Sequence, residues 1–370
     1  MRHDPGLASW LQLSLTPGLS AAAIRALLRQ FGLPQNILER KRTELAPHAG
    51  GAALEALDSD EVRGAVARAL DWAAEQGNHV VTLSDPAYPK ALLDIADPPP
   101  LLYARGRLEL LNRAALAIVG SRNATAQGAL NAEAFAKALS DAGLTIVSGL
   151  AVGIDAAAHR GGLAGASSTV AVLGTGVDIV YPSRNAPLAA EIATRGALVS
   201  EFALGSAPLA HNFPRRNRLI SGLAKGCLVV EAALASGSLI TAHAAADQGR
   251  EVFAIPGSIH SPLAKGCHAL IKTGAKLVES AEDVLAELLG FQPSGRASTV
   301  APAGPSDESG PASGLLAHMG YEPVDVDSLC TRSGMSAEQV SSELLRLELA
   351  GRVAALPGGL YQRLEKAGLE

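Results

Sequence analysis

Short apolar segments alternate with helical stretches between residues 113 and 289, and this alternation constrains the fold more than any other feature of the sequence. The apolar segments are Ala115–Val119, Thr145–Ser148, Thr169–Leu173, Ala197–Ser200, Leu228–Val230, Val252–Ile255 and Lys276–Val278. Helical stretches such as Thr125–Ala142 and Asp155–Ala164 lie between them. Continuous apolar strands that alternate with helices indicate a parallel sheet covered on both faces. We therefore predict an α/β fold with a doubly wound, mostly parallel sheet.

The composition changes sharply on both sides of this region. Residues 1–76 look helical, with two short amphipathic helices around a Pro17-Gly18 turn. This pattern resembles a helix–hairpin–helix module, but a plain helical bundle is favoured because no second copy is present. Residues 77–112 carry five prolines, which forbid a long helix and indicate an extended connector into the core. Residues 290–313 lack periodicity and are rich in Pro, Ser, Ala and Gly, as is typical of a flexible linker.

The last segment, residues 314–370, regains an ordered pattern. Two helices flank a turn at residues 333–336, and two short strands follow, as in a winged helix. The second helix carries Arg346 as its one base against three glutamates. Because an acidic recognition helix suits a phosphate backbone poorly, a protein-contact or regulatory role is expected here rather than DNA reading.

Overall charge and cysteine content limit the function classes. The formal net charge is -5, so the chain is not basic overall, although a local basic patch remains compatible with nucleic-acid binding. Cys227, Cys267 and Cys330 form no CxxC pair, which argues against a zinc site and fits a reducing cytosol. No signal peptide and no apolar run of ~18 residues is visible. We expect a cytoplasmic protein with no membrane insertion, no metal and no cofactor.

Three glycine turns follow successive predicted strands. They are Gly120–Arg122, Ser148-Gly149 and Gly174–Gly176. The first offers the Ser121 hydroxyl and the Arg122 guanidinium, which can form a two-pronged contact with phosphate. Because open α/β sheets bind ligands at the carboxyl ends of their strands, the three turns should converge on one crevice. The dinucleotide fingerprint GxGxxG is absent.

A basic run, NFPRRNRLI at residues 212–220, is the strongest local anomaly. No Asp or Glu occurs between Glu201 and Glu231, whereas this interval contains Arg215, Arg216, Arg218 and Lys225. Arginines bind phosphates, and an aromatic such as Phe213 offers any base a stacking face. A merely solvated helix face explains neither the missing carboxylates nor the neighbouring Phe213 and Asn217. The run therefore predicts binding of a phosphate polymer.

Other polar residues leave alternatives open. Asp155 and His159 lie one helical turn apart and could form a catalytic dyad, but capping and packing roles are favoured because no nucleophile has a place beside His159. Ser238, near the start of a predicted helix, could cap that helix or touch phosphate. Glu231 could be catalytic or could accept hydrogen bonds that hold a loop.

Taken in order, five motifs resemble the DprA/Smf DNA-processing family. They are GSR (120–122), SGLAVGIDAAAH (148–159), NFPRRNRLISGL (212–223), VVEAALASGSLITA (229–242) and VFAIPG (252–257). The resemblance extends to the connector and covers nearly the whole chain. It implies an extended Rossmann-like DNA-binding domain at residues 113–289, flanked by a helical domain like SAM or helix–hairpin–helix modules and by a winged-helix-like domain.

The resemblance also implies a function without catalysis. The expected protein binds single-stranded DNA, protects incoming DNA and loads the RecA recombinase onto it during natural transformation. The implied partners are single-stranded DNA, RecA and a second copy in a homodimer, with single-stranded DNA-binding protein as a further candidate. By position, the implied DNA-binding residues are Ser121, Arg122, Gly149, Gly174, Phe213, Arg215, Arg216, Asn217, Arg218, Lys225 and Ser238.

One position departs from the family pattern. A lysine stands three residues before the aromatic in a family member, where this sequence has Ala210 followed by His211. Two other functions compete with strand binding. A nucleoside monophosphate phosphoribohydrolase would use Glu231, but the PGGxGT run of such enzymes is missing. A nucleotide sensor acting on duplex DNA through its winged helix is disfavoured by the acidic second helix.

Overall fold

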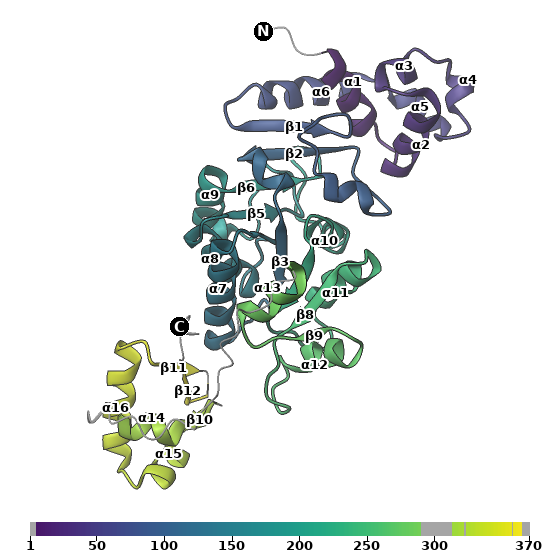
Figure 1. Cartoon of the computed structure of the whole chain (residues 1–370). Coiled ribbons are helices and arrows are strands. Elements are labelled where there is room, and N and C mark those ends of the chain that lie inside the picture. The colour runs from purple at the N-terminus through teal and green to yellow at the C-terminus, as the bar shows by residue number, and fades with distance from the viewer. Residues whose placement is uncertain (1–4, 290–312, 322, 357, 365–370) are drawn as a thin grey trace.

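A nine-stranded sheet runs through the centre of the protein in the computed structural model, which describes residues 5–289, 313–321, 323–356 and 358–364 (Figure 1). The strand order is β1-β2-β6-β5-β4-β3-β7-β8-β9. The strands are β1 (Asn78–Thr82), β2 (Leu101–Gly106), β3 (Ala115–Val119), β4 (Thr145–Ser148), β5 (Thr169–Val172), β6 (Ala197–Ser200), β7 (Gly226–Val229), β8 (Glu251–Ala254) and β9 (Lys276–Leu277). All pairs from β6 to β9 are parallel, which confirms the predicted α/β fold.

The Pro-rich segment contributes more than a connection. It forms β1 and β2, which pair antiparallel with each other and continue the sheet through an antiparallel β2–β6 pair. Its five prolines fall between the two strands, at residues 86–100, so neither strand loses a ladder donor. The proline pattern thus describes the loop between the strands and not the strands themselves.

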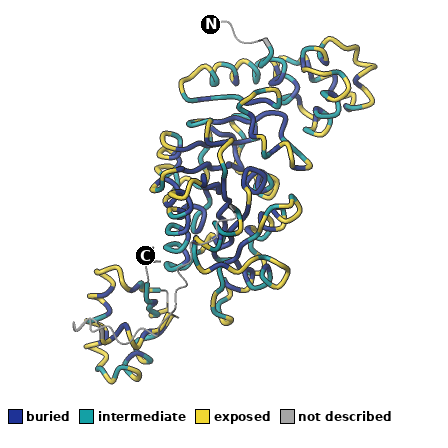
Figure 2. Tube along the Cα trace, viewed as in Figure 1, coloured by how far each residue is buried: buried dark blue, intermediate teal, exposed yellow. Residues whose placement is uncertain are grey.

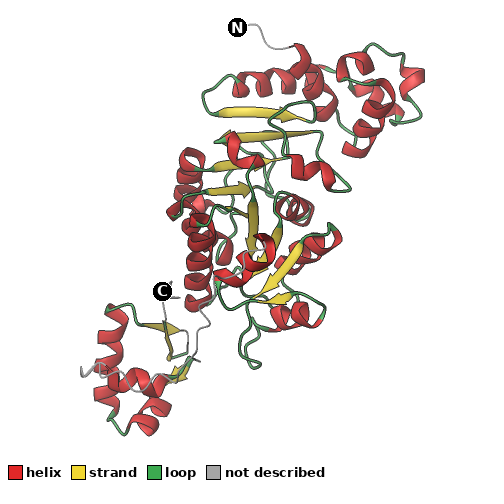
Figure 3. Cartoon of the chain, in the orientation of Figure 1, coloured by secondary structure: helices red, strands yellow, loops and turns green. Residues whose placement is uncertain are grey.

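Helices cover both faces of the sheet (Figure 3). They are α7 (Ala126–Asp141), α8 (Ile154–Ala164), α9 (Ala186–Arg195), α10 (Asn212–Gly222), α11 (Gly237–Asp247), α12 (Lys265–Lys272) and α13 (Ala281–Leu289). Strand β3 shows why its sequence is apolar throughout. Ala115, Ala117 and Val119 enter the core beneath α10 and α11, whereas Leu116 and Ile118 enter the core beneath α7 and α8. Alternate side chains thus serve opposite cores, and both faces need apolar residues.

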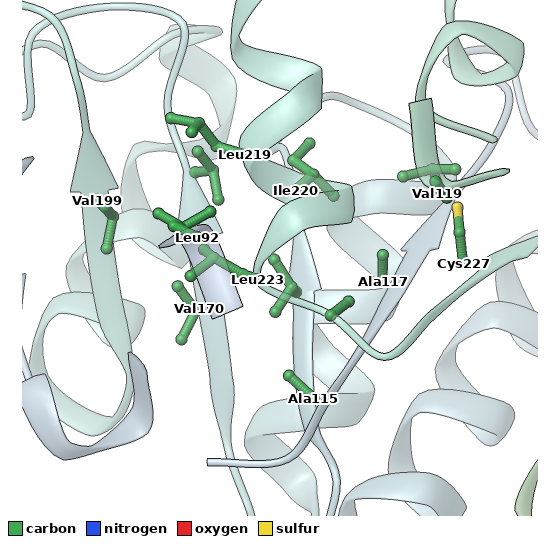
Figure 4. Packing of buried hydrophobic residues seen from close by; sticks show 14 of the residues in the cluster. Leu92, Ala115, Ala117, Val119, Val170, Val199, Leu219, Ile220, Leu223 and Cys227 are labelled. Atoms are coloured by element: carbon green, nitrogen blue, oxygen red, sulfur yellow. The ribbon is translucent and has the colours of Figure 1, made fainter. Parts of the chain in front are cut away.

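Helix α10, which carries the basic run, is fixed to the sheet by its apolar side. Leu219, Ile220 and Leu223 share a core with Ala117 and Val170 of the sheet (Figure 4) and are almost fully buried. Figure 2 shows the same contrast in the middle of the sheet, where strands β3 to β7 are dark blue under partly exposed helices. The polar residues of α10 consequently have a fixed direction relative to the strand ends.

The N-terminal helices pack on the end of the sheet that β1 and β2 form. They are α1 (Pro5–Leu15), α2 (Ala21–Phe31), α3 (Pro34–Leu38), α4 (Arg42–Leu45), α5 (Gly51–Ala56) and α6 (Asp60–Ala73). Leu11 of α1 and Ala69 of α6 share a core with Tyr103 of β2 and Leu198 of β6. Apolar burial therefore joins the helical part to the α/β part.

The C-terminal part has the predicted winged-helix elements. Helices α14 (Ser313–Met319), α15 (Val326–Ser333) and α16 (Ala337–Leu349) accompany a sheet of order β10-β12-β11, with β10 (Val324–Asp325), β11 (Val353–Leu356) and β12 (Leu360–Arg363). Arg346, the one base of α16, is paired with Glu343 at 2.6 Å. The expected flexible linker lies outside the described residues, apart from Ser313, which begins α14. Within the described residues, no helix is both long and apolar enough to span a membrane.

Candidate nucleic-acid interface

A cavity of about 670 Å³ lies where the strand order reverses, between the carboxyl ends of β3 and β7. Such a reversal point is where open α/β sheets bind ligands. Six of the residues expected at the site line this cavity: Ser121, Arg122, Phe213, Arg216, Asn217 and Ser238. They come from the turn after β3, from α10 and from the start of α11, so separate parts of the sequence meet in one crevice.

Arg216 lies buried at the bottom of this crevice. Its side chain is among the buried residues, with 4% of the residue exposed. Nη1 donates to the carbonyl oxygens of Gly149, at 2.8 Å, and of Val172, and Nε donates to Oδ1 of Asn217 at 3.1 Å. Burial lowers the pKa of Arg216 to about 10, a shift that Asp155 opposes, so the guanidinium is charged at neutral pH. Arg216 therefore ties α10 to the ends of β4 and β5.

Gly149 and Gly174 make room for side chains of α10. A Cβ on Gly149 would lie 2.5–2.6 Å from the guanidinium of Arg216. A Cβ on Gly174 would lie 2.7 Å from the ring of Phe213. Real Cβ atoms do not approach other atoms so closely, so any larger residue at either position would displace the side chain of α10 that lies against it. These two residues shape the crevice from below and support its functional side chains.

The ring of Phe213 is half-buried against Gly174 and flanked by two exposed side chains. The guanidinium carbon of Arg122 lies 5.9 Å from its centroid, within cation–π range. The ring of Tyr181 lies 5.6 Å away, centroid to centroid, at an angle of 43°. An aromatic surface beside a cation is the combination that a base and its phosphate require.

Two other arginines of the basic run are held by carboxylates. The side chain of Glu201 is 2% exposed and accepts from Arg218 at 2.7 Å and from Arg215 at 3.3 Å. Arg218 also pairs with Asp97 at 3.3 Å, and Asp97 is paired in turn with Arg25 of α2. Burial acts to raise the pKa of Asp97, but the two arginines outweigh it and hold that pKa below its usual value. The run is free of carboxylates in sequence but not in space.

Lys225 is the one expected site residue at the opposite edge of the sheet. Its backbone N–H donates to the carbonyl of Ala115, the first residue of β3, at 2.8 Å. It also immediately precedes β7. The crevice lies at the carboxyl ends of the same two strands, so the structure does not bring Lys225 to it. Proximity in sequence to the basic run gave no information here, because α10 carries the chain from one edge of the sheet to the other.

Glu231 is engaged in holding the turn after β3. Its carboxylate accepts from the backbone N–H of Thr125 at 2.9 Å and from the Thr125 hydroxyl at 2.6 Å. Its carbonyl oxygen accepts from the N–H of Ser121 at 2.7 Å. A Cβ on Gly128 would lie 2.3 Å from the carboxyl carbon, so α7 packs closely on it. These contacts support the loop-holding role over the catalytic one.

Asp155 and His159 hold the turn after β4. Oδ2 of Asp155 accepts from the N–H groups of Gly149 at 3.1 Å and Ala151 at 3.4 Å. Nε2 of His159 accepts from the N–H of Leu150 at 3.2 Å, which leaves its Nδ1–H to donate to the hydroxyl of Thr169 at 2.7 Å. Leu150 has a φ of 57°, an unusual conformation for leucine that these bonds maintain.

The two groups are consequently unsuited to form a dyad. Burial raises the pKa of Asp155 while Arg216 opposes that shift, and burial lowers the pKa of His159 to about 3. His159 is therefore neutral, with both ring nitrogens occupied. The favoured packing role agrees with this arrangement. The capping detail differs, since Gly153 occupies the N-cap of α8 and Asp155 bonds the preceding loop.

Sequence reasoning missed Tyr181 and Arg184 at the site and Asn185, which holds the turn beside them. The amide of Asn185 donates to the carbonyls of Leu150 at 2.8 Å and Ala151 at 3.2 Å. The available signal was an aromatic after the third glycine turn in a chain with 4% aromatics.

Ala210, the position of the family lysine, lines the cavity, whereas His211 does not.

The chain is similar to known proteins over most of its length. Residues 79–289 match the family model described as DNA recombination-mediator protein A, and residues 299–359 match the DprA winged helix domain. The chain belongs to the DprA/Smf family. Protein Smf of Escherichia coli K12 is 45% identical over 309 residues, covering 82% of both chains. DNA processing protein DprA of Streptococcus pneumoniae R6 is 48% identical over 206 residues, covering 56% of this chain and 73% of that protein.

Solved structures of DprA proteins show the same fold. That of DprA from Streptococcus pneumoniae has a TM-score of 0.67 and 39% identity, covering 75% of this chain and 96% of that one. A second structure, of DNA processing protein A from Helicobacter pylori, concerns the single-stranded DNA binding mode of that protein. It has a TM-score of 0.52 and 29% identity, covering 57% of this chain and 96% of the other.

Proposed function

We propose that this protein binds single-stranded DNA in the crevice between β3 and β7 and acts on it without catalysis. The observation that carries the proposal is the ring of Phe213, half-buried on Gly174 with the exposed guanidinium of Arg122 5.9 Å from its centroid. A stacked base and its phosphate would fit these two groups together. The Helicobacter pylori protein, whose structure concerns its single-stranded DNA binding mode, supports the same ligand class.

The contacts of the crevice suit a strand of any sequence. Phe213 offers a ring face, which every base can use, while Arg122 offers charge, which every phosphate can use. The acidic and titratable groups nearby, Asp155, His159 and Glu231, are already bonded to backbone or hydroxyl groups of the protein. Such engaged groups support a binding role over the phosphoribohydrolase alternative.

Fluorescence anisotropy with a labelled oligo-dT tests the proposal directly. Phe213→Ala is expected to weaken binding by about 5- to 150-fold, the usual contribution of one stacked base. Lys225→Ala is the matched control, because Lys225 lies in the same segment but at the other edge of the sheet. Equal affinities for wild type and Phe213→Ala, or release of free base from nucleoside monophosphates by the wild type, would contradict the proposal.

Within this proposal the bound strand is protected and passed to the RecA recombinase during natural transformation, with the protein acting as a cytoplasmic homodimer. Membership of the DprA/Smf family supports this part. The protein should shorten the lag of RecA assembly on DNA coated with single-stranded DNA-binding protein. Phe213→Ala should restore the lag.

Light scattering coupled to size exclusion tests the homodimer and should give twice the chain mass of 37.8 kDa. An unchanged lag or a monomeric mass would remove the corresponding claim.

A further inference from the structure

A second cavity, of about 240 Å³, adjoins the first at Phe213. Five residues line both cavities: Arg122, Ala151, Tyr181, Phe213 and Arg216. The remaining residues of the second cavity are Gly149, Val152, Pro182 and Arg184. Because Phe213 and Tyr181 border both spaces, a strand that leaves the first cavity past Phe213 reaches Tyr181 next.

The second cavity differs from the first in its charges. Among the described residues its lining holds three arginines and no carboxylate, whereas Asp155 lines the first cavity. Arg216 is buried and bonded internally. Arg184 is exposed, and within the described residues its side chain has no ion pair or hydrogen bond. The side chain of Arg122 likewise has no ion pair or hydrogen bond there and lies over the ring of Phe213. The second cavity thus exposes two cations that are available to a ligand.

Tyr181 is a large aromatic residue that is exposed to solvent. It is 47% exposed, and its ring lies 5.6 Å from that of Phe213. A base inserted between two rings needs roughly 7 Å, twice an aromatic contact distance of about 3.5 Å. The pair therefore cannot clamp one base between its rings. Each ring instead has a separate face to offer, which suits two consecutive bases.

The segment that carries these residues is fixed on both sides. The carbonyl of Ile179 accepts from the hydroxyl of Thr175 at 2.6 Å. Asn185 donates to the carbonyls of Leu150 and Ala151 in the turn after β4. Tyr181 and Arg184 lie between these two anchors, so little ordering of the protein opposes ligand binding.

We propose that the second cavity is a further nucleotide subsite, with one base against the Tyr181 ring and its phosphate against Arg184. This subsite rests on the proposed function, since it extends the strand held at Phe213. It assigns the contact with this phosphate to Arg184, which lies outside the basic run. Arg184 comes from the segment after β5, where the sequence shows no cluster of bases.

Binding of oligo-dT by four variants of the full chain tests the subsite. Tyr181→Ala should weaken binding by about 5- to 150-fold, while Tyr181→Phe should bind as wild type, because the ring and not the hydroxyl makes the contact. Arg184→Ala should make the slope of log K against log salt less negative by about 0.7, the share of one phosphate on a single strand. Arg113→Ala, an exposed arginine before β3, should change neither quantity.

The outcomes separate this subsite from the proposed function. If Phe213→Ala loses affinity while Tyr181→Ala and Arg184→Ala bind with wild-type affinity and slope, the subsite is wrong and the strand-binding crevice stands. If the wild type does not bind oligo-dT, the proposed function itself fails. The affinity of Tyr181→Ala tests the ring contact only if this variant melts close to the wild-type temperature. If that variant melts early, weakened binding by Tyr181→Phe overturns the ring contact, and an unchanged slope in Arg184→Ala overturns the phosphate contact.

Discussion

Replacing Arg216 with methionine distinguishes a structural cation from a ligand contact. The substitution keeps an unbranched side chain but removes the donors to the carbonyls of Gly149 and Val172 and to Asn217. Each buried acceptor left unpaired costs about 1–3 kcal/mol. Asp155 also loses its cationic neighbour. We therefore expect the free energy of unfolding to fall by about 3–5 kcal/mol, the lower part of the sum for three unpaired acceptors.

This loss is large enough to measure by thermal and urea unfolding. For a domain the size of residues 79–289, each 1 kcal/mol shifts the melting temperature by about 2–4 °C, so Arg216→Met should melt about 6–20 °C lower. Arg122→Met is the matched control, because Arg122 is exposed and makes no ion pair in the described residues. It should melt as wild type but bind oligo-dT less tightly. If Arg216→Met melts within 2 °C of wild type and loses only salt-sensitive binding, the structural account of Arg216 is refuted.

Three further predictions concern the crevice and its support. Gly174→Ala should displace the Phe213 ring, because its Cβ would lie 2.7 Å from that ring, and should weaken oligo-dT binding at least 5-fold, while Gly51→Ala, with open space around it, should not. Because the pKa of His159 is lowered to about 3, the neutral side chain stabilises the fold above pH 6.5, and this stability is lost as the pH falls toward about 3. The free energy of unfolding, measured in urea, should therefore fall by about 2 kcal/mol between pH 6.5 and 5. The fall should be smaller in His159→Gln. Ala210→Lys should restore a cation to the cavity wall, tighten binding and steepen the salt slope by about 0.7; an unchanged slope would show that this position does not reach the strand.

The hydrophobic pattern was sufficient to locate the parallel part of the sheet, because buried parallel strands must be apolar on both faces. Each predicted segment from Ala115–Val119 to Lys276–Val278 overlaps a strand of the structure, although β7 and β8 begin one or two residues earlier than predicted. Strands β1 and β2 were missed because the prolines of the intervening loop dominated the composition of that segment. A short strand between turn residues has little hydrophobic pattern of its own. The partner of β2 in the main sheet, β6, lies far along the sequence.

The candidate site was predictable in position but less so in the roles of its residues. Convergence of the glycine turns follows from parallel topology, so their sequence positions predicted the crevice. The roles depend on which partners the fold supplies. Glu201 and Asp97 reach Arg218 from outside the basic run, and the length of α10 separates Lys225 from the crevice. Arg184 gave no local signal, because a lone arginine after a strand is common.

The slope of binding affinity against salt tests the central claim most directly. Oligo-dT affinity should fall linearly on a log–log plot as salt rises, because phosphate contacts release counterions. Arg122→Ala should make the slope less negative by about 0.7, and Lys225→Ala should leave it unchanged. Affinity that does not respond to salt, or a change in Lys225→Ala as large as that in Arg122→Ala, would contradict a phosphate-binding crevice at the carboxyl ends of β3 and β7.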